Sequence, residues 1–388
     1  MKRLISLVMI GMSSFVFGQQ SKTNDSLPPL IPTTKQGLIK DFDVRFYVRS
    51  GFDANFEENK LQTSRFFADE LRIDMKAKLH ERVSVRFRHR FNTKPVPGTL
   101  DKMSSAVNLA FIEVQALPKM SVSFGKLGAD WGGYEYDLNA IEILAYNDIL
   151  SRAENYLVGL GIAYQVHDKH RFNFQLLNAS ANKLDEVGEF AMPKGSEVSK
   201  TPYAFVGNWR GSFWNDKFQT SYSYSYFTQA KNRAMQYIAL GNKYESGRLT
   251  WMYDFQYSHN GIDKNGIISS MFAAEEPELL ESVSYIDHWT RIDYKVLTNF
   301  CLSLTLMTSN GYAKNITATN EGYSHLRKSY GIIPMLQYRP FKKVDLRFFA
   351  AYVGRWYNYS SYAKENLNQH NYSTGRIALG LIAPLNVF

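Results

Sequence analysis

The sequence predicts an all-β protein, a transmembrane antiparallel β-barrel of about sixteen strands whose third long loop folds inward. Three observations predict it: apolar and polar residues alternate along many segments, short and long connections alternate between those segments, and after Gly18 no run approaches the roughly 20 apolar residues of a spanning helix. Only helices and closed barrels satisfy their backbone polar groups in lipid. The 388 residues also exceed a single sandwich domain of about 100.

The chain begins with the features of a secretory signal. Lys2 and Arg3 precede an apolar run from Leu4 to Phe17, and the small residue Gly18 follows. The run is too short to span a membrane, so residues 1–18 are predicted to be a cleavable signal peptide. A buried N-terminal helix is the alternative, but it would leave the basic start and the small-residue exit as coincidences.

The segment after the signal is predicted to be a flexible periplasmic leader. Residues 19–40 are rich in proline and other turn formers and show no sustained periodicity. The alternating pattern starts directly afterwards and continues to the end of the chain. The barrel is therefore predicted to occupy residues 41–388.

Composition agrees with an exported barrel. Hydrophobic residues make up 45% of the chain, yet the mean hydropathy is −0.32, and aromatic residues reach 15%. Such a chain is rich in strand formers and in rings that favour membrane interfaces. The single cysteine, Cys301, excludes an intrachain disulfide and a cysteine metal site. The net charge of +9 suits nucleic acid, acidic lipid or anionic solutes, and export makes nucleic acid the least favoured partner.

Two segments show the alternation most clearly. In VSVRFRHRF, residues 83–91, arginine occupies positions 86, 88 and 90 between apolar or aromatic residues. In residues 221–226 serine alternates with tyrosine. Since successive side chains of a strand point to opposite faces, each segment has one polar and one apolar face. A soluble sandwich would bury the apolar face, whereas a membrane barrel would turn it to lipid and the polar face to a wet lumen.

Connection lengths give the strand count. Short turns are predicted near residues 80–82, 117–119, 167–170, 214–217, 242–247, 297–300 and 340–343. Longer connections are predicted near 53–65, 92–105, 128–156, 179–202, 228–234, 258–283, 309–326 and 358–372. Seven short turns alternating with eight long loops give sixteen strands, with both chain ends on the short-turn side. This sorting is typical of bacterial outer-membrane barrels, and one miscounted hairpin would give fourteen or eighteen strands.

The polar face of the first three strands is predicted to form one basic wall. It comprises Arg45, Arg49, Arg72, Lys76, Lys78, Arg82, Arg86, Arg88 and Arg90. Within these strands Asp43, Glu70 and Asp74 offset part of the charge. A row of guanidinium and ammonium groups would concentrate anions and pass them along the lumen. The alternative is a salt-bridge network that only stiffens the wall.

The third long loop, residues 128–156, is predicted to narrow the pore. Helical spacing covers residues 139–150 with Asn139 as N-cap, and the loop's apolar residues must be buried somewhere. Its acidic residues are expected to face the basic wall: Glu135, Asp137, Glu142, Asp148 and Glu154. An external cap packed on other loops is the alternative. Lys126, just before this loop, lies either at the rim or inside through a bulge at Gly125.

Segment 124–160, FGKLGADWGGYEYDLNAIEILAYNDILSRAENYLVGL, resembles the corresponding part of porins from the Bacteroidetes group that are related to the phosphate-selective porins O and P. The likeness lies in a strand ending in FGK, the GGYEYDLN run, a short aromatic and acidic helix, and a strand opening on a hydrophobic-Gly pattern. The resemblance implies a diffusion pore in the bacterial outer membrane that contacts outer-membrane lipid and often forms a homotrimer. Some members line the channel with arginine and lysine, so small anionic solutes are expected, with phosphate as one candidate.

The sequence has two rival functional interpretations. None of the eight histidines lies in a GxSxG or HExxH motif, so no catalytic residue, metal or cofactor is predicted and an outer-membrane hydrolase is disfavoured. A plugged barrel whose loops dock partners is the other alternative. An open pore would conduct ions and a docking barrel would be silent.

Overall fold

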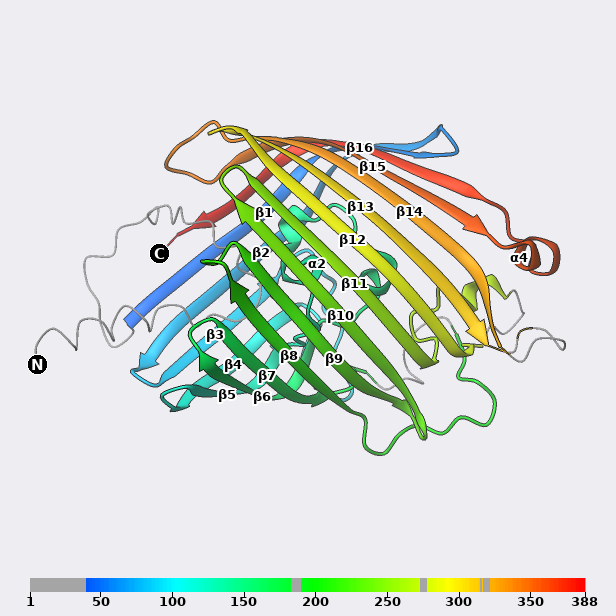
Figure 1. The fold of residues 1–388 in the computed structure, drawn as a ribbon, viewed down its shortest axis with the longest axis horizontal. Helices are drawn as coiled ribbons and strands as arrows, with labels where there is room; N and C mark the ends of the chain where they lie inside the picture. Colours follow the sequence, from blue (N-terminus) through cyan, green and yellow to red (C-terminus); the bar gives the residue numbers. More distant parts are fainter. Residues whose placement is uncertain (1–39, 183–189, 273–277, 315, 317–321, 388) are drawn as a thin grey trace, which may run out of the picture.

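A computed structural model describes residues 40–182, 190–272, 278–314, 316 and 322–387. The predictions for residues 1–18 and 19–40 lie outside this part of the chain, apart from Lys40, where the first strand begins. Sixteen antiparallel strands form one closed barrel in which each strand pairs with its sequence neighbours and β1 pairs with β16 (Figure 1). The predicted antiparallel barrel and its number of strands are confirmed.

The strands follow one another without crossover. The first eight are β1 (Lys40–Glu57), β2 (Lys60–His80), β3 (Val83–Arg90), β4 (Val107–Leu117), β5 (Met120–Gly128), β6 (Tyr156–His167), β7 (His170–Asn178) and β8 (Tyr203–Phe213). The others are β9 (Phe218–Ala230), β10 (Arg233–Ser246), β11 (Leu249–Ile262), β12 (Glu281–Leu297), β13 (Phe300–Lys314), β14 (Tyr323–Tyr338), β15 (Arg347–Tyr359) and β16 (Tyr372–Asn386).

Two predicted long loops are wrong. Residues 53–65 belong to β1 and β2, which are joined by Glu58 and Asn59 alone, and the connection predicted at 228–234 is a two-residue turn between β9 and β10. Glu58 and Asn59 have φ of 47° and 65°, and Asn232 has φ of 60°. Positive φ at the centre of a two-residue turn matches the twist of the flanking strands, so these hairpins close tightly. Six of the seven predicted short turns have four residues or fewer, and the seventh spans residues 339–346.

The two faces of the strands are sorted as a membrane barrel requires. Ser221, Ser223 and Ser225 are buried, whereas Tyr224 and Tyr226 between and beside them are 49% and 38% exposed. Large apolar side chains of the same outward parity are exposed on every wall, among them Ile112, Phe124, Phe174, Leu302, Phe348 and Leu379. The apolar surface thus faces outward and the polar surface inward, the reverse of a soluble domain.

In the described part of the chain, short helical segments occur in three of the long connections. The β5–β6 loop (residues 129–155), the predicted third long loop, contains α2 (Tyr134–Asp137), η2 (Ala140–Glu142) and α3 (Asp148–Ser151); the β11–β12 and β15–β16 connections contain η4 (Ser269–Met271) and α4 (Ser361–Asn366). No helix in the described part of the chain is long and apolar enough to cross a membrane. The single helix predicted over residues 139–150 is wrong, because the structure has the separate short segments η2 and α3 there. Asn139 is nevertheless the N-cap of η2, since its side chain accepts a hydrogen bond from the Ile141 N–H at 3.3 Å.

Candidate functional site

The β5–β6 loop begins with a helix that is fixed to the far side of the barrel. The backbone N–H groups of Tyr134 and Glu135 donate to the two carboxylate oxygens of Asp254 on β11, at 2.9 and 2.7 Å. Gly133 makes this contact possible, because its φ is 85° and a Cβ there would lie 2.8 Å from the Asp254 Oδ2 atom. The glycine pair in GGYEYDLN thus lets the loop approach β11 closely.

The middle of the β5–β6 loop is held by the side where the barrel closes. Arg49 on β1 donates through Nη1 to the carbonyl oxygens of Ala140, Ile141 and Ile143, at 3.1, 3.1 and 2.7 Å. Arg376 on β16 donates to the carbonyl oxygen of Leu144. The Ala140 carbonyl also accepts from the Ile143 N–H at 3.2 Å, which closes the single turn of η2. The carbonyl groups of Ile141, Ile143 and Leu144 are bound to guanidinium groups, which explains why one continuous helix does not form.

The end of the β5–β6 loop is fixed to a third part of the barrel. Asn147 donates through Nδ2 to the carbonyl oxygens of His288 on β12 and Thr308 on β13, at 3.1 and 2.9 Å. The Asp287 carboxylate accepts from the Ile149 N–H at 3.0 Å. The loop therefore contacts β11, β1 and β16 through strand side chains, and then β12 and β13 through the Asp287 side chain and backbone carbonyl groups.

Four of the five predicted acidic residues form ion pairs with basic residues outside the predicted basic wall. Asp137 pairs with Arg210 on β8, and Glu154 with Lys264 in the β11–β12 connection. The remaining pairs join Glu142 to Arg347 and Arg291 at 2.9 and 3.6 Å, and Asp148 to Arg327 and Arg355 at 2.6 and 2.7 Å. These carboxylates were expected to face the arginines of the first three strands, but they pair with arginines of β8, β12, β14 and β15 and with Lys264 of the β11–β12 connection.

The fifth acidic residue, Glu135, is fully buried. Its carboxyl oxygens accept from the Asn147 N–H at 2.6 Å and from the Gln256 Nε2 atom at 3.1 Å. Burial, together with the nearby carboxyl groups of Asp254 and Asp287, raises the pKa of Glu135 well above its usual range. Burial also opposes ionisation of Asp148, but the guanidinium groups of Arg327 and Arg355 outweigh it and hold the pKa of Asp148 below its usual range.

The arginine partners of the loop were missed by sequence reasoning. Arg291 and Arg347 already had the polar parity of their strands in the alternating pattern, and so did Arg355. They were overlooked because they are spread over separate strands, whereas the first three strands concentrate their basic residues. A search for strand arginines of polar parity, matched to the acidic loop residues, could have found them.

The basic wall itself is assembled as the alternation predicts. Between β2 and β3 the register pairs Arg72 with Arg90, Asp74 with Arg88 and Lys76 with Arg86. Between β1 and β2 it pairs Arg45 with Asp74 and Arg49 with Glu70. These side chains consequently share one face of three adjacent strands.

Most of the basic wall is neutralised in part. Arg86 and Arg88 both bind Asp74, at 2.8 and 2.6 Å, and Arg72 and Arg90 both bind Glu70, at 2.7 and 3.2 Å. Four guanidinium groups thus share two carboxylates, and this cluster keeps two positive charges. Four further basic residues lie towards the short-turn end: Arg45 pairs with Asp43 at 2.9 Å, Lys76 and Lys78 are half-buried, and Arg82 is exposed in the turn. The ninth residue, Arg49, is bound to Asp69 and to the β5–β6 loop.

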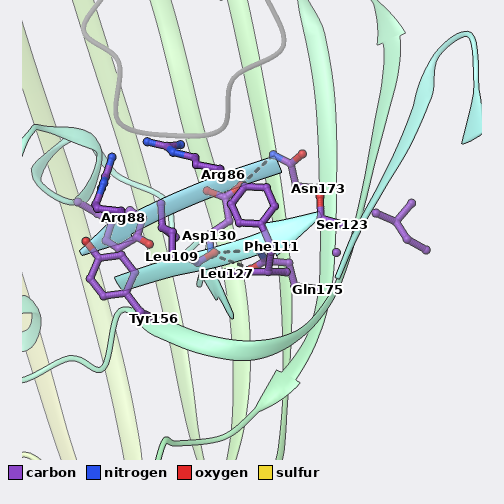
Figure 2. A pocket seen from close by; sticks show the side chains of 14 residues that line it. Arg86, Arg88, Leu109, Phe111, Ser123, Leu127, Asp130, Tyr156, Asn173 and Gln175 are labelled. Atoms are coloured by element: carbon purple, nitrogen blue, oxygen red, sulfur yellow. Dashed lines mark hydrogen bonds between the residues drawn. The ribbon is translucent and has the colours of Figure 1, made fainter. Parts of the chain in front are cut away.

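Arg86 and Arg88 line a narrow cavity of about 40 Å³ together with aromatic residues of neighbouring strands. Figure 2 shows both guanidinium groups of β3 beside Phe111 of β4 and Tyr156 of β6. Asp130 of the β5–β6 loop also lines the cavity; its carboxylate accepts from Asn173 at 2.8 Å and its N–H donates to Gln175 at 2.8 Å. The cavity therefore lies between the basic wall and the β5–β6 loop.

Lys126 lies at the long-loop end of β5. Its Nζ atom is 3.1 Å from Asp101 in the connection between β3 and β4, and its side chain is buried. The β4–β5 pairing continues through Gly125 without a register shift, so no bulge turns Lys126 inward. The rim alternative is the one that fits.

A closed sixteen-strand barrel with an apolar exterior, a charged interior and a loop bound to several of its walls defines the class of outer-membrane porins. The chain belongs to the family of phosphate-selective porins O and P, whose model matches residues 42–382. It is therefore a diffusion porin of the bacterial outer membrane. No curated protein matches it in sequence.

Solved structures share the fold. The outer membrane channel DcaP of Acinetobacter baumannii has a TM-score of 0.61 at 12% identity, over 91% of this chain and 99% of that one. OmpT of Vibrio cholerae has a TM-score of 0.53 at 10% identity, over 91% and 99%. An anion-selective porin from Comamonas acidovorans has a TM-score of 0.52 at 8% identity, over 88% and 99%. Family and fold point to a channel and away from an enzyme.

Proposed function

We propose that this porin passes small hydrophilic solutes with a preference for anions, phosphate among them. The observation that carries the proposal is the cluster of four guanidinium groups on two carboxylates in the basic wall. A unit charge attracts an anion by about 1 kcal/mol at 4 Å in bulk water, and more strongly between low-dielectric walls. Lys76, Lys78 and Arg82 extend the positive surface towards the short-turn end.

The β5–β6 loop is proposed to narrow the passage between itself and the basic wall. The support is its set of contacts with β11, with β1 and β16, and with β12 and β13. Asp137, Glu142 and Asp148 of the loop bind arginines on other strands, and Glu154 binds Lys264, so these carboxylates do not cancel the charge left over on the basic wall. A negative solute would then meet a positive surface on one side and loop side chains on the other.

Anion preference is tested by the reversal potential of single barrels in a planar bilayer under a salt gradient. For wild type, the sign of the reversal potential is expected to show that anions permeate more readily than cations. Replacing Arg86, Arg88 and Arg90 by Gln is expected to move the potential towards cation preference. Because that change leaves Asp74 without partners, the variant Asp74→Asn, Arg86→Gln, Arg88→Gln serves as a second version that buries no lone charge. Arg248→Gln, in the β10–β11 turn, is the matched control and should leave the potential unchanged.

The rival functions predict different results. A docking barrel with a plugged lumen would show no steady current in the same bilayer. A hydrolase would turn over ester or peptide substrates, and we expect none from the purified barrel. An unchanged reversal potential in the triple-arginine variant would show that selectivity resides elsewhere.

Two finer points rest on the resemblance of segment 124–160. We infer that the chain comes from the Bacteroidetes group and that it works as a homotrimer surrounded by outer-membrane lipid. Chemical cross-linking of the barrel in native membranes is expected to give a three-chain product. A product limited to single chains would contradict the trimer.

A further inference from the structure

We infer that the long-loop end of the barrel carries a binding site for aromatic carboxylates. The site is a cavity of about 370 Å³, within the range of small-molecule pockets. It is bounded by the ends of β9 and β10 and by the connections that follow β3, β5, β7 and β11. Binding at this site does not depend on the proposed function; only the later passage of the bound solute through the pore does.

The floor of this cavity is apolar and aromatic. Trp131, Ile149 and Leu150 of the β5–β6 loop line it together with Phe227 and Met235. The Trp131 and Phe227 rings stack with their centroids 4.6 Å apart and an interplanar angle of 7°. An aromatic solute gains both burial and ring contacts on such a surface. Inorganic phosphate would gain neither.

The rim of the cavity is basic. Arg152, Lys200 and Lys264 line it, and Glu154 is its one acidic lining residue in the described part of the chain. Glu154 is already bound to Lys264. Arg152 and Lys200 thus remain as the positive groups that would meet a carboxylate, and a guanidinium can bind it through two parallel hydrogen bonds.

The ligand class is tested by titrating the purified barrel in detergent by calorimetry with four probes. Benzoate has the ring and the charge, acetate only the charge, benzamide only the ring, and benzylammonium the ring with the opposite charge. Benzoate is expected to bind saturably and at least about tenfold more tightly than each of the others, the ratio expected for a hydrogen bond to a charged group. Equal binding of benzoate and acetate, or of benzoate and benzamide, would overturn the inference.

The location is tested with variants. Trp131→Leu removes one of the rings of the floor, and we expect benzoate binding to weaken about fivefold. Ser199→Trp fills the cavity from a half-buried loop position and should abolish binding even if Trp131→Leu disturbs folding. Lys200→Gln should weaken binding about threefold, as expected for an exposed charge. Lys194→Gln, in the same connection but 92% exposed and outside the cavity, should bind like wild type.

Wild-type binding in both Trp131→Leu and Ser199→Trp would overturn the site. The reversal potential of the wild-type barrel reports the proposed anion preference separately. Anion preference without benzoate binding would refute only this inference, whereas benzoate binding in a barrel without anion preference would refute only the proposed function.

Discussion

At the scale of single residues, Asp148 joins the β5–β6 loop to two strands. Its carboxylate binds Arg327 on β14 and Arg355 on β15, and it also accepts from the Ser329 hydroxyl at 3.0 Å. All four side chains are buried or nearly so. Losing one partner of a buried ion pair leaves a charge without compensation, which matters more than the net strength of the pair.

Replacing Asp148 by Asn is therefore expected to destabilise the barrel by about 3–5 kcal/mol. Urea unfolding of the purified protein, followed by tryptophan fluorescence, measures the change. Glu278→Gln is the matched control, because its partner Lys194 is 92% exposed and exposed pairs contribute at most about 1 kcal/mol. Equal stabilities of the two variants would contradict the assignment.

Glu135 gives a pH-dependent prediction, because its pKa is shifted upward, whereas that of Asp148 is shifted downward. Its pKa is raised in the folded state, so the folded chain holds this proton more tightly than the unfolded chain. The free energy of unfolding then decreases as pH rises above about 4.3, the ordinary value for glutamate. Glu135→Gln cannot lose a proton, so its stability relative to wild type is expected to improve between pH 4 and pH 8. Urea unfolding at both pH values checks the sign, and a relative stability that worsens would refute it.

At the scale of elements, the strands were predictable and the connections only in part. Period-two alternation depends on residues that are neighbours in sequence, so it located the strands. The hairpin at Glu58 and Asn59 was predicted as a loop because polar residues in a long protruding strand resemble a loop. The helix over 139–150 failed for another reason: Arg49, about 90 residues away in sequence, binds the carbonyl groups that would continue it. Contacts of that kind leave no local pattern.

Gly133 tests how the β5–β6 loop is seated. Gly133→Ala is expected to push α2 away from Asp254, since the added Cβ would lie 2.8 Å from a carboxylate oxygen, and single-channel conductance should change. Gly195→Ala is a matched control, because Gly195 has a similar φ of 81° but no atom within 4 Å of a Cβ. It shares the backbone strain and lacks the clash. Identical conductance in the two variants would show that the contact with Asp254 does not set the loop position.

At the scale of the whole molecule, the interior charge is distributed in two groups. The basic wall on β1 to β3 keeps an excess of positive charge, whereas the arginines of β8, β12, β14 and β15 are bound to carboxylates of the β5–β6 loop. The sequence predicted the first group from its density on adjacent strands. It did not predict the second, because pairing between residues up to 207 positions apart depends on the closed fold.

If the excess charge governs selectivity, salt should weaken it. The Debye length falls from about 10 Å at 0.1 M to about 3 Å at 1 M ionic strength. Anion preference, measured as the reversal potential for a fixed concentration ratio, is therefore expected to be smaller at the higher salt concentration. A preference that does not depend on salt would indicate selection by pore size.

The two ends of the barrel domain, β1 and β16, meet along one seam, and Arg49 and Arg376 hold consecutive parts of the same loop across it. The loop is translated long before β16, so it cannot be fastened on that side until the last strand arrives. Pairing of the C-terminal strand with β1 thus closes the cylinder and adds the last of these loop contacts in a single step. A chain that stops short of β16 would lack both the closure and the Arg376 contact.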